Sequence, residues 1–96
     1  MISAKQRAYL RSLANDYDTI LQIGKEGIKD TTVIQTRDAL DARELVKMRV
    51  LETCPHTARE AARLLAEEIK CDVVQIIGHK FILYKPAKEA KIKLPK

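Results

Sequence analysis

The stretch that decides the fold runs from residue 57 to residue 84 and reads TAREAARLLAEEIKCDVVQIIGHKFILY. Its first half predicts an amphipathic helix, because apolar residues recur at positions 58, 61, 62, 65 and 69, which share one helix face. Thr57 and Glu60 have the spacing of a capping box that starts such a helix. The second half predicts a hairpin in which strands 73–77 and 81–84 flank a turn at Gly78.

The preceding residues alternate between helical and extended patterns. We expect helices over 3–14 and from about 30 to 43, and strands over 19–23 and 45–51. The resulting order α-β-α-β-α-β-β predicts an α/β fold: one domain with a mixed four-stranded sheet packed with three helices. Strands that are separated by helices favour parallel crossovers, and the final hairpin adds an antiparallel pair.

Composition indicates a single globular domain. The chain has 96 residues, of which 46% are hydrophobic and 32% charged. No apolar run approaches the ~20 residues that span a bilayer, and no secretion leader opens the chain, so we expect a cytoplasmic protein without a membrane partner. Cys54 and Cys71 flank the predicted third helix, about 20 Å apart. That separation argues against a disulfide or a shared metal ion.

The charge is concentrated near the C-terminus. The formal net charge is +5, and residues 85–96 contain five lysines against one glutamate, which leaves the rest of the chain near +1. We expect residues 1–86 to form the folded domain and residues 87–96 to form a flexible basic tail. Phosphate-bearing partners suit this balance, but a basic surface on the body then requires that charges of one sign gather on one face.

The segment Gly24-Lys25-Glu26-Gly27 joins a predicted strand to a predicted helix. Such a loop can bring backbone amides close to a phosphate, or it can be an ordinary turn that needs a positive φ. It lacks the third glycine of a dinucleotide site and the Gly-Lys-Ser/Thr end of a P-loop, so nucleotide hydrolysis is not predicted. Strand alternation puts Lys47 and Arg49 on one face, where they either bind a partner or are merely solvated.

Four ordered blocks resemble one known family. They are KQRAYLRSLA (5–14), QIGKEG (22–27), RELVKMRV (43–50) and VQIIGHKFILYKP (74–86). Together they resemble the CRM domain, the chloroplast RNA splicing and ribosome maturation type, and within it the stand-alone bacterial YhbY proteins. The resemblance implies a fold similar to the C-terminal domain of a bacterial translation initiation factor. It also implies a non-catalytic RNA-binding protein that associates with precursors of the large ribosomal subunit.

The resemblance also implies which residues bind RNA. They are the four loop residues, two strand cations and three cations of the first helix: Gly24, Lys25, Glu26, Gly27, Lys47, Arg49, Lys5, Arg7 and Arg11. Glu26 departs from the pattern, because a carboxylate disfavours phosphate. We expect a monomer with ribosomal RNA as its partner and no cofactor, metal or small-molecule substrate. The alternative, based on the near-neutral body, is an interaction module that docks on a ribosomal protein or assembly factor.

Overall fold

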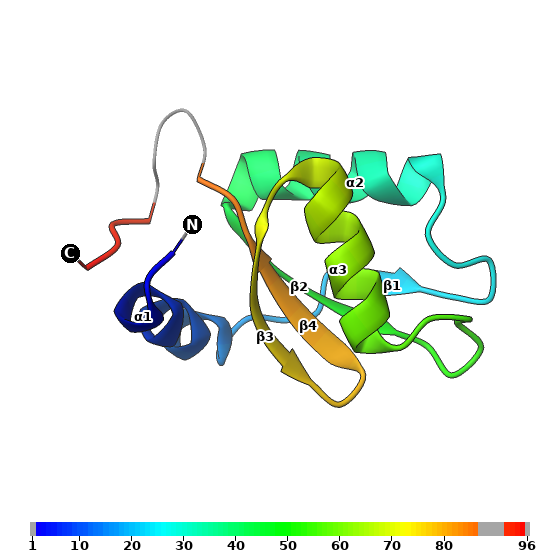
Figure 1. Cartoon of the computed structure of the whole chain (residues 1–96), viewed down its shortest axis with the longest axis horizontal. Helices are drawn as coiled ribbons and strands as arrows, with labels where there is room; N and C mark the ends of the chain where they lie inside the picture. Colours follow the sequence, from blue (N-terminus) through cyan, green and yellow to red (C-terminus); the bar gives the residue numbers. More distant parts are fainter. Residues whose placement is uncertain (1, 87–91, 96) are drawn as a thin grey trace.

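The structure, a computed structural model, describes residues 2–86 and 92–95 (Figure 1). The predicted α-β-α-β-α-β-β order and the single mixed sheet are confirmed. The elements are α1 (Ala4–Ala14), β1 (Leu21–Ile23), α2 (Asp30–Arg43), β2 (Leu45–Val50), α3 (Ala58–Ile69), β3 (Asp72–Ile77) and β4 (Lys80–Tyr84).

The capping box predicted at Thr57 is present, and a second one starts α1. The Ser3 hydroxyl accepts the Gln6 backbone N–H at 3.1 Å, and the Gln6 side chain accepts the Ser3 N–H at 3.0 Å. Thr57 and Glu60 make the same reciprocal pair at the start of α3, at 3.1 and 2.9 Å. Each box satisfies amides that a helix start leaves without partners, which explains why α1 and α3 begin where the sequence predicts.

The sheet has the strand order β1-β2-β4-β3, so β2 and β4 form its centre. β1 runs parallel to β2, and β4 runs antiparallel to both of its neighbours. β1 is shorter than the predicted strand over 19–23, although the Ile20 N–H still donates to the Lys47 carbonyl at 3.1 Å. The ends of β1 and β2 and the turn between β3 and β4 therefore lie at one end of the sheet.

Helices cover both faces of the sheet. α2 and α3 pack on one face over a core that includes Val46, Met48, Val50 and Phe81. α1 packs on the other face over Leu45, Val74, Ile82 and Tyr84. The alternation predicted for β2 is confirmed, because its even-numbered residues face α2 and α3 and its odd-numbered residues face α1.

Part of the predicted tail differs from the expectation. Ile92 and Leu94 pack against the apolar cluster between α1 and the sheet. The Ile92 N–H also donates to the Glu44 carboxylate at 3.0 Å. Glu44 is fully buried where α2 turns directly into β2, with a φ of 65°. Its carbonyl also accepts the Lys85 N–H at 2.9 Å. A buried carboxylate needs donors, and residue 92 supplies one, so residues 92–95 are anchored. Residues 87–91 and 96 lie outside the described residues.

Candidate nucleic-acid interface

The Gly24–Gly27 loop is a tight turn closed by its own backbone. The Gly27 N–H donates to the Gly24 carbonyl at 3.0 Å. Gly27 is buried with a φ of +70°, and a Cβ there would lie 3.2 Å from Pro55 Cγ and 3.4 Å from His56 Nε2. Backbone conformation and packing thus account for this glycine, and its N–H is already used within the turn.

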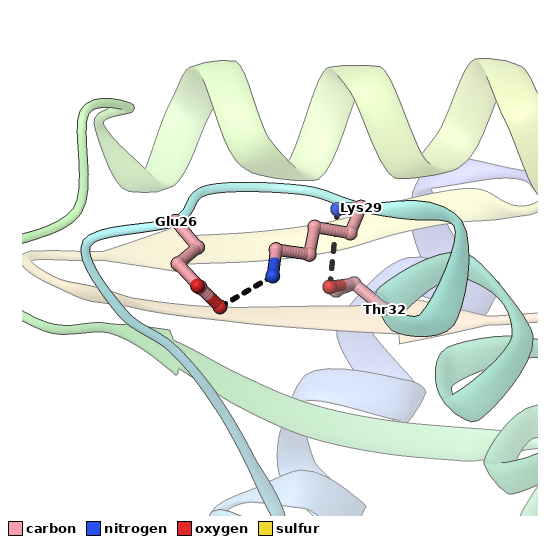
Figure 2. A network of polar contacts seen from close by, with 3 residues as sticks. All are labelled: Glu26, Lys29 and Thr32. Atoms are coloured by element: carbon pink, nitrogen blue, oxygen red, sulfur yellow. Dashed lines mark hydrogen bonds and ion pairs between the residues drawn. The ribbon is translucent and has the colours of Figure 1, made fainter.

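Near the loop, Glu26 and Lys29 form an ion pair, whereas Lys25 has no partner among the described residues. Lys29 Nζ lies 2.5 Å from the Glu26 carboxylate, and both side chains are at least half exposed (Figure 2). Thr32 Oγ1 accepts the Lys29 N–H at 3.2 Å, which fixes the backbone from which this ammonium extends (Figure 2). The carboxylate that departs from the family pattern is therefore balanced by Lys29. Lys25 has no such partner within residues 2–86 and 92–95.

A row of side chains crosses all four strands next to this loop. Gln22 pairs with Arg49, Arg49 with Lys80, and Lys80 with Ile77. Paired residues point to the same side of a sheet, so these four share the face that α1 only partly covers. We call them the open row: Gln22, Lys80 and Ile77 are exposed, the last by 51%, and Arg49 is half-buried.

Lys47 lies at the edge of the sheet area on which α1 packs. It lies two residues before Arg49 on β2, one row nearer to α1, opposite the buried Ile82. Its ammonium donates to the Ala14 carbonyl at 3.4 Å, in the last turn of α1. A cation at a helix C-terminus stabilises the helix dipole. Lys47 therefore has a structural contact as well as a place beside the open row.

The cations of α1 are exposed but are spread along the helix. Arg11 lies in the last turn, near the carbonyl that Lys47 contacts. Lys5 lies nine residues before Ala14, about 14 Å along the helix axis. Arg7 also belongs to the first half of α1, where the Gln6 side chain donates to the Pro95 carbonyl at 3.0 Å. The structure thus places Arg11 closest to the strand cations and Lys5 farthest from them.

The end of the sheet is hollowed beside the open row. A cavity of about 390 Å³ is lined by Arg49, Lys80, Ile77, His79, Glu52, Val50 and Leu51. The Val50 N–H donates to the His79 carbonyl at 2.8 Å, which holds the hairpin turn against the end of β2. Glu52 is the carboxylate in this lining and opposes an anionic ligand there.

Sequence reasoning missed three residues of the open row. Gln22 could have been found from the alternation of β1, because its neighbours Leu21 and Ile23 both pack toward α2 and α3. Lys80 and Ile77 lie next to the predicted turn, because Ile77 is the last residue of β3 and Lys80 is the first residue of β4. Their pairing with Arg49 depends on the order of β2, β4 and β3, which residue spacing does not reveal.

Titratable groups with shifted pKa values lie away from this surface. The Thr57 backbone and hydroxyl lower the pKa of Glu60, as in any capping box. Burial, with the charge of Asp72, raises the pKa of the Cys71 thiol to about 11. Burial also raises the pKa of Tyr84, helped by Glu44 and Asp72.

Across the described ranges, no three His, Cys, Asp or Glu side chains gather where a metal ion could bind. No described helix is long and apolar enough to cross a bilayer.

These features define a small α/β domain with one partly uncovered, cation-bearing sheet face beside a glycine turn. The model of the CRS1/YhbY (CRM) domain matches residues 2–85, and the chain belongs to this family.

Relatives agree with this assignment over nearly the whole chain. It is 41% identical to "Probable RNA-binding protein YqeI" of Bacillus subtilis, over 99% of this chain and 100% of that protein. It is 33% identical to "RNA-binding protein" of Haemophilus influenzae, over 99% and 96%. A hypothetical protein of Staphylococcus aureus, described as a candidate RNA-binding protein, has a solution structure that matches with a TM-score of 0.82 at 41% identity. That match covers 99% of this chain and 100% of the other.

Proposed function

We propose that this protein binds structured RNA through the open row and the neighbouring Gly24–Gly27 loop, without catalysis. The observation that carries the proposal is the alignment of cations that lack carboxylate partners. Lys25, Arg49 and Lys80 make no side-chain hydrogen bond or ion pair within residues 2–86 and 92–95. Such cations are available to phosphate oxygens, and the names of the relatives support RNA as the source of the phosphates.

The geometry favours contact with a folded RNA surface. The open row lies on a sheet and the loop extends beyond its end, so the cations are spread over an open surface, in which Arg49 and Lys80 also line the cavity at the end of the sheet. Phosphate contacts of this kind orient an RNA without reading its sequence. Phe81 and Tyr84 are buried in the core, and the two exposed aromatic side chains, Tyr9 and Tyr17, do not belong to the open row. Recognition of RNA shape therefore fits this surface better than stacking on single strands.

The resemblance to YhbY proteins supports a more specific role. We infer that the RNA is ribosomal RNA within precursors of the large ribosomal subunit, and that the protein acts as a monomer during ribosome assembly. Sedimentation of a cell extract through a density gradient tests this role. The protein should migrate with large-subunit precursors and should leave those fractions after treatment with a nuclease. Migration only at the top of the gradient would contradict the role.

A groove between α2 and α3 supports a second candidate function. It has a volume of about 540 Å³, and Ile34 and Leu64 in its lining are 50% and 36% exposed. Exposed apolar side chains of this kind favour docking of a protein, such as a ribosomal protein or an assembly factor. The two functions differ in their response to salt. Binding to purified RNA should weaken steeply as salt rises, whereas docking of a protein in this groove need not.

A further inference from the structure

Two side chains on the α1 side of the sheet each contain a buried polar atom without a hydrogen-bond partner. They are Arg49, at Nε, and Gln75, at Oε1. Buried polar atoms in folded proteins are almost always paired, because leaving one unpaired destabilises the fold. Neither residue makes any other side-chain hydrogen bond within the described residues. Both atoms lie at the edge of the open row, where a bound water or a group of a ligand can pair them.

The two side chains lie on either side of β4. Arg49 pairs with Lys80 of β4, and Gln75 of β3 pairs with Ile82, two residues farther along that strand. Both therefore point to the face that α1 partly covers, and both are half-buried at the border of this cover. Beyond Gln75 on the same face lies Ile77, which is half exposed. A ligand seated on the open row would thus lie next to both groups.

The two atoms need opposite partners. Nε of Arg49 is a donor and needs an acceptor, whereas Oε1 of Gln75 is an acceptor and needs a donor. Phosphate oxygens satisfy the arginine and can also accept from the Gln75 side-chain NH2, but they cannot pair Oε1 of Gln75, because an ionised phosphodiester has no hydrogen to donate. The ribose 2′-hydroxyl of RNA has both a donor and an acceptor. The terminal torsion of a glutamine is soft, so its amide can turn toward such a hydroxyl.

We propose that Gln75 accepts a hydrogen bond from a ribose 2′-hydroxyl while Arg49 donates to a neighbouring phosphate or ribose oxygen. Gln75 would then make this surface selective for RNA over DNA, while the cations supply affinity for either. The inference rests on the proposed function, since it requires a nucleic acid on the open row. It adds a residue that phosphate binding does not need.

The test uses one hairpin in three forms, as RNA, as 2′-O-methyl RNA and as DNA, at a fixed salt concentration. The 2′-O-methyl form is the decisive comparison, because it keeps the RNA helix shape but loses the donor. For Gln75→Leu, affinity for RNA should fall by about threefold to tenfold, the effect of one hydrogen bond, with affinity for 2′-O-methyl RNA and DNA unchanged. Gln35→Leu, at an exposed position of α2, is the matched control and should bind all three like the native protein.

Two further measurements separate recognition from a structural role. Gln75→Leu removes an atom that has no partner in the fold, so its melting temperature should equal or exceed that of the native protein. Gln75→Glu keeps acceptor oxygens, so all affinities should fall through repulsion while the preference of RNA over 2′-O-methyl RNA remains. A loss by Gln75→Leu that is equal for all three hairpins would overturn the proposal. If the native protein binds all three equally, this inference fails while RNA binding stands, and if it binds none, both fail.

Discussion

Gly27→Ala is expected to destabilise the fold without abolishing RNA binding. An L-residue in the left-handed conformation, as at a φ of +70°, is disfavoured by about 1–2 kcal/mol. The new Cβ would also lie 3.2 Å from Pro55 Cγ, which must shift slightly. Alanine loses less conformational entropy on folding than glycine, which offsets part of this effect. We expect a net loss of about 1–2 kcal/mol, and about 4–8 °C of melting temperature for each kcal/mol.

Gly24→Ala is the matched control in the same turn. Its backbone is not left-handed, and a Cβ would meet only Leu51 Cδ1, at an ordinary distance of 3.7 Å. Its stability should change by less than about 0.5 kcal/mol. Urea unfolding followed by circular dichroism gives both values. Binding is then measured well below the melting temperature, where Gly27→Ala should bind RNA like the native protein, because its N–H is used inside the turn.

Two results would refute this reasoning. If Gly27→Ala is as stable as Gly24→Ala, neither the backbone conformation nor the contact with Pro55 explains the glycine. If folded Gly27→Ala loses RNA binding while its stability is unchanged, then glycine is required at position 27 for contact with the ligand rather than for the fold.

Four other outcomes are expected. Arg49→Ala should weaken RNA binding and lower the salt slope by about one, and an unchanged slope would contradict a contact between Arg49 and a phosphate. Lys47→Ala should lower the free energy of unfolding by about 0.3–1 kcal/mol in urea unfolding, because its contact with the end of α1 disappears; a value equal to that of the native protein would contradict this. Removal of residues 87–96 should leave a folded domain that is about 1–3 kcal/mol less stable in urea unfolding, because Glu44 loses a donor; unchanged stability would show that this contact contributes nothing. The Cys71 thiol, with its pKa raised to about 11, should react with iodoacetamide at pH 8 about 100-fold more slowly than an unperturbed cysteine. Its rate, followed by mass spectrometry, should rise with pH up to that pKa, and rapid labelling of the folded protein at pH 8 would contradict the burial of this thiol.

Local patterns predicted the elements well, because each depends on neighbouring residues. The capping boxes at Ser3 and Thr57 use partners three residues away, and both helices start there. Alternation along β2 correctly put Lys47 and Arg49 on the face opposite Met48. These features need only the periodicity of one helix or strand, which the sequence contains in full.

Features that depend on tertiary pairing could not be predicted in the same way. Charge and composition suggested a free tail, but Ile92 is held by Glu44, which lies 48 residues away and is buried by the turn from α2 into β2. Similarly, Lys80 and Gln22 join Arg49 only because β2 lies between β1 and β4. Of the four residues in the open row, the sequence therefore predicted only Arg49. Its cross-strand neighbours Gln22, Lys80 and Ile77 were not predicted.

The most direct test of the proposed RNA surface is a titration of the ¹⁵N-labelled protein with a structured RNA hairpin, followed by amide chemical shifts. We predict that the largest changes fall on the Gly24–Gly27 loop, on Arg49 and on Lys80, and that they diminish as salt is added. Changes centred instead on Ile34 and Leu64, in the groove between α2 and α3, would contradict the account.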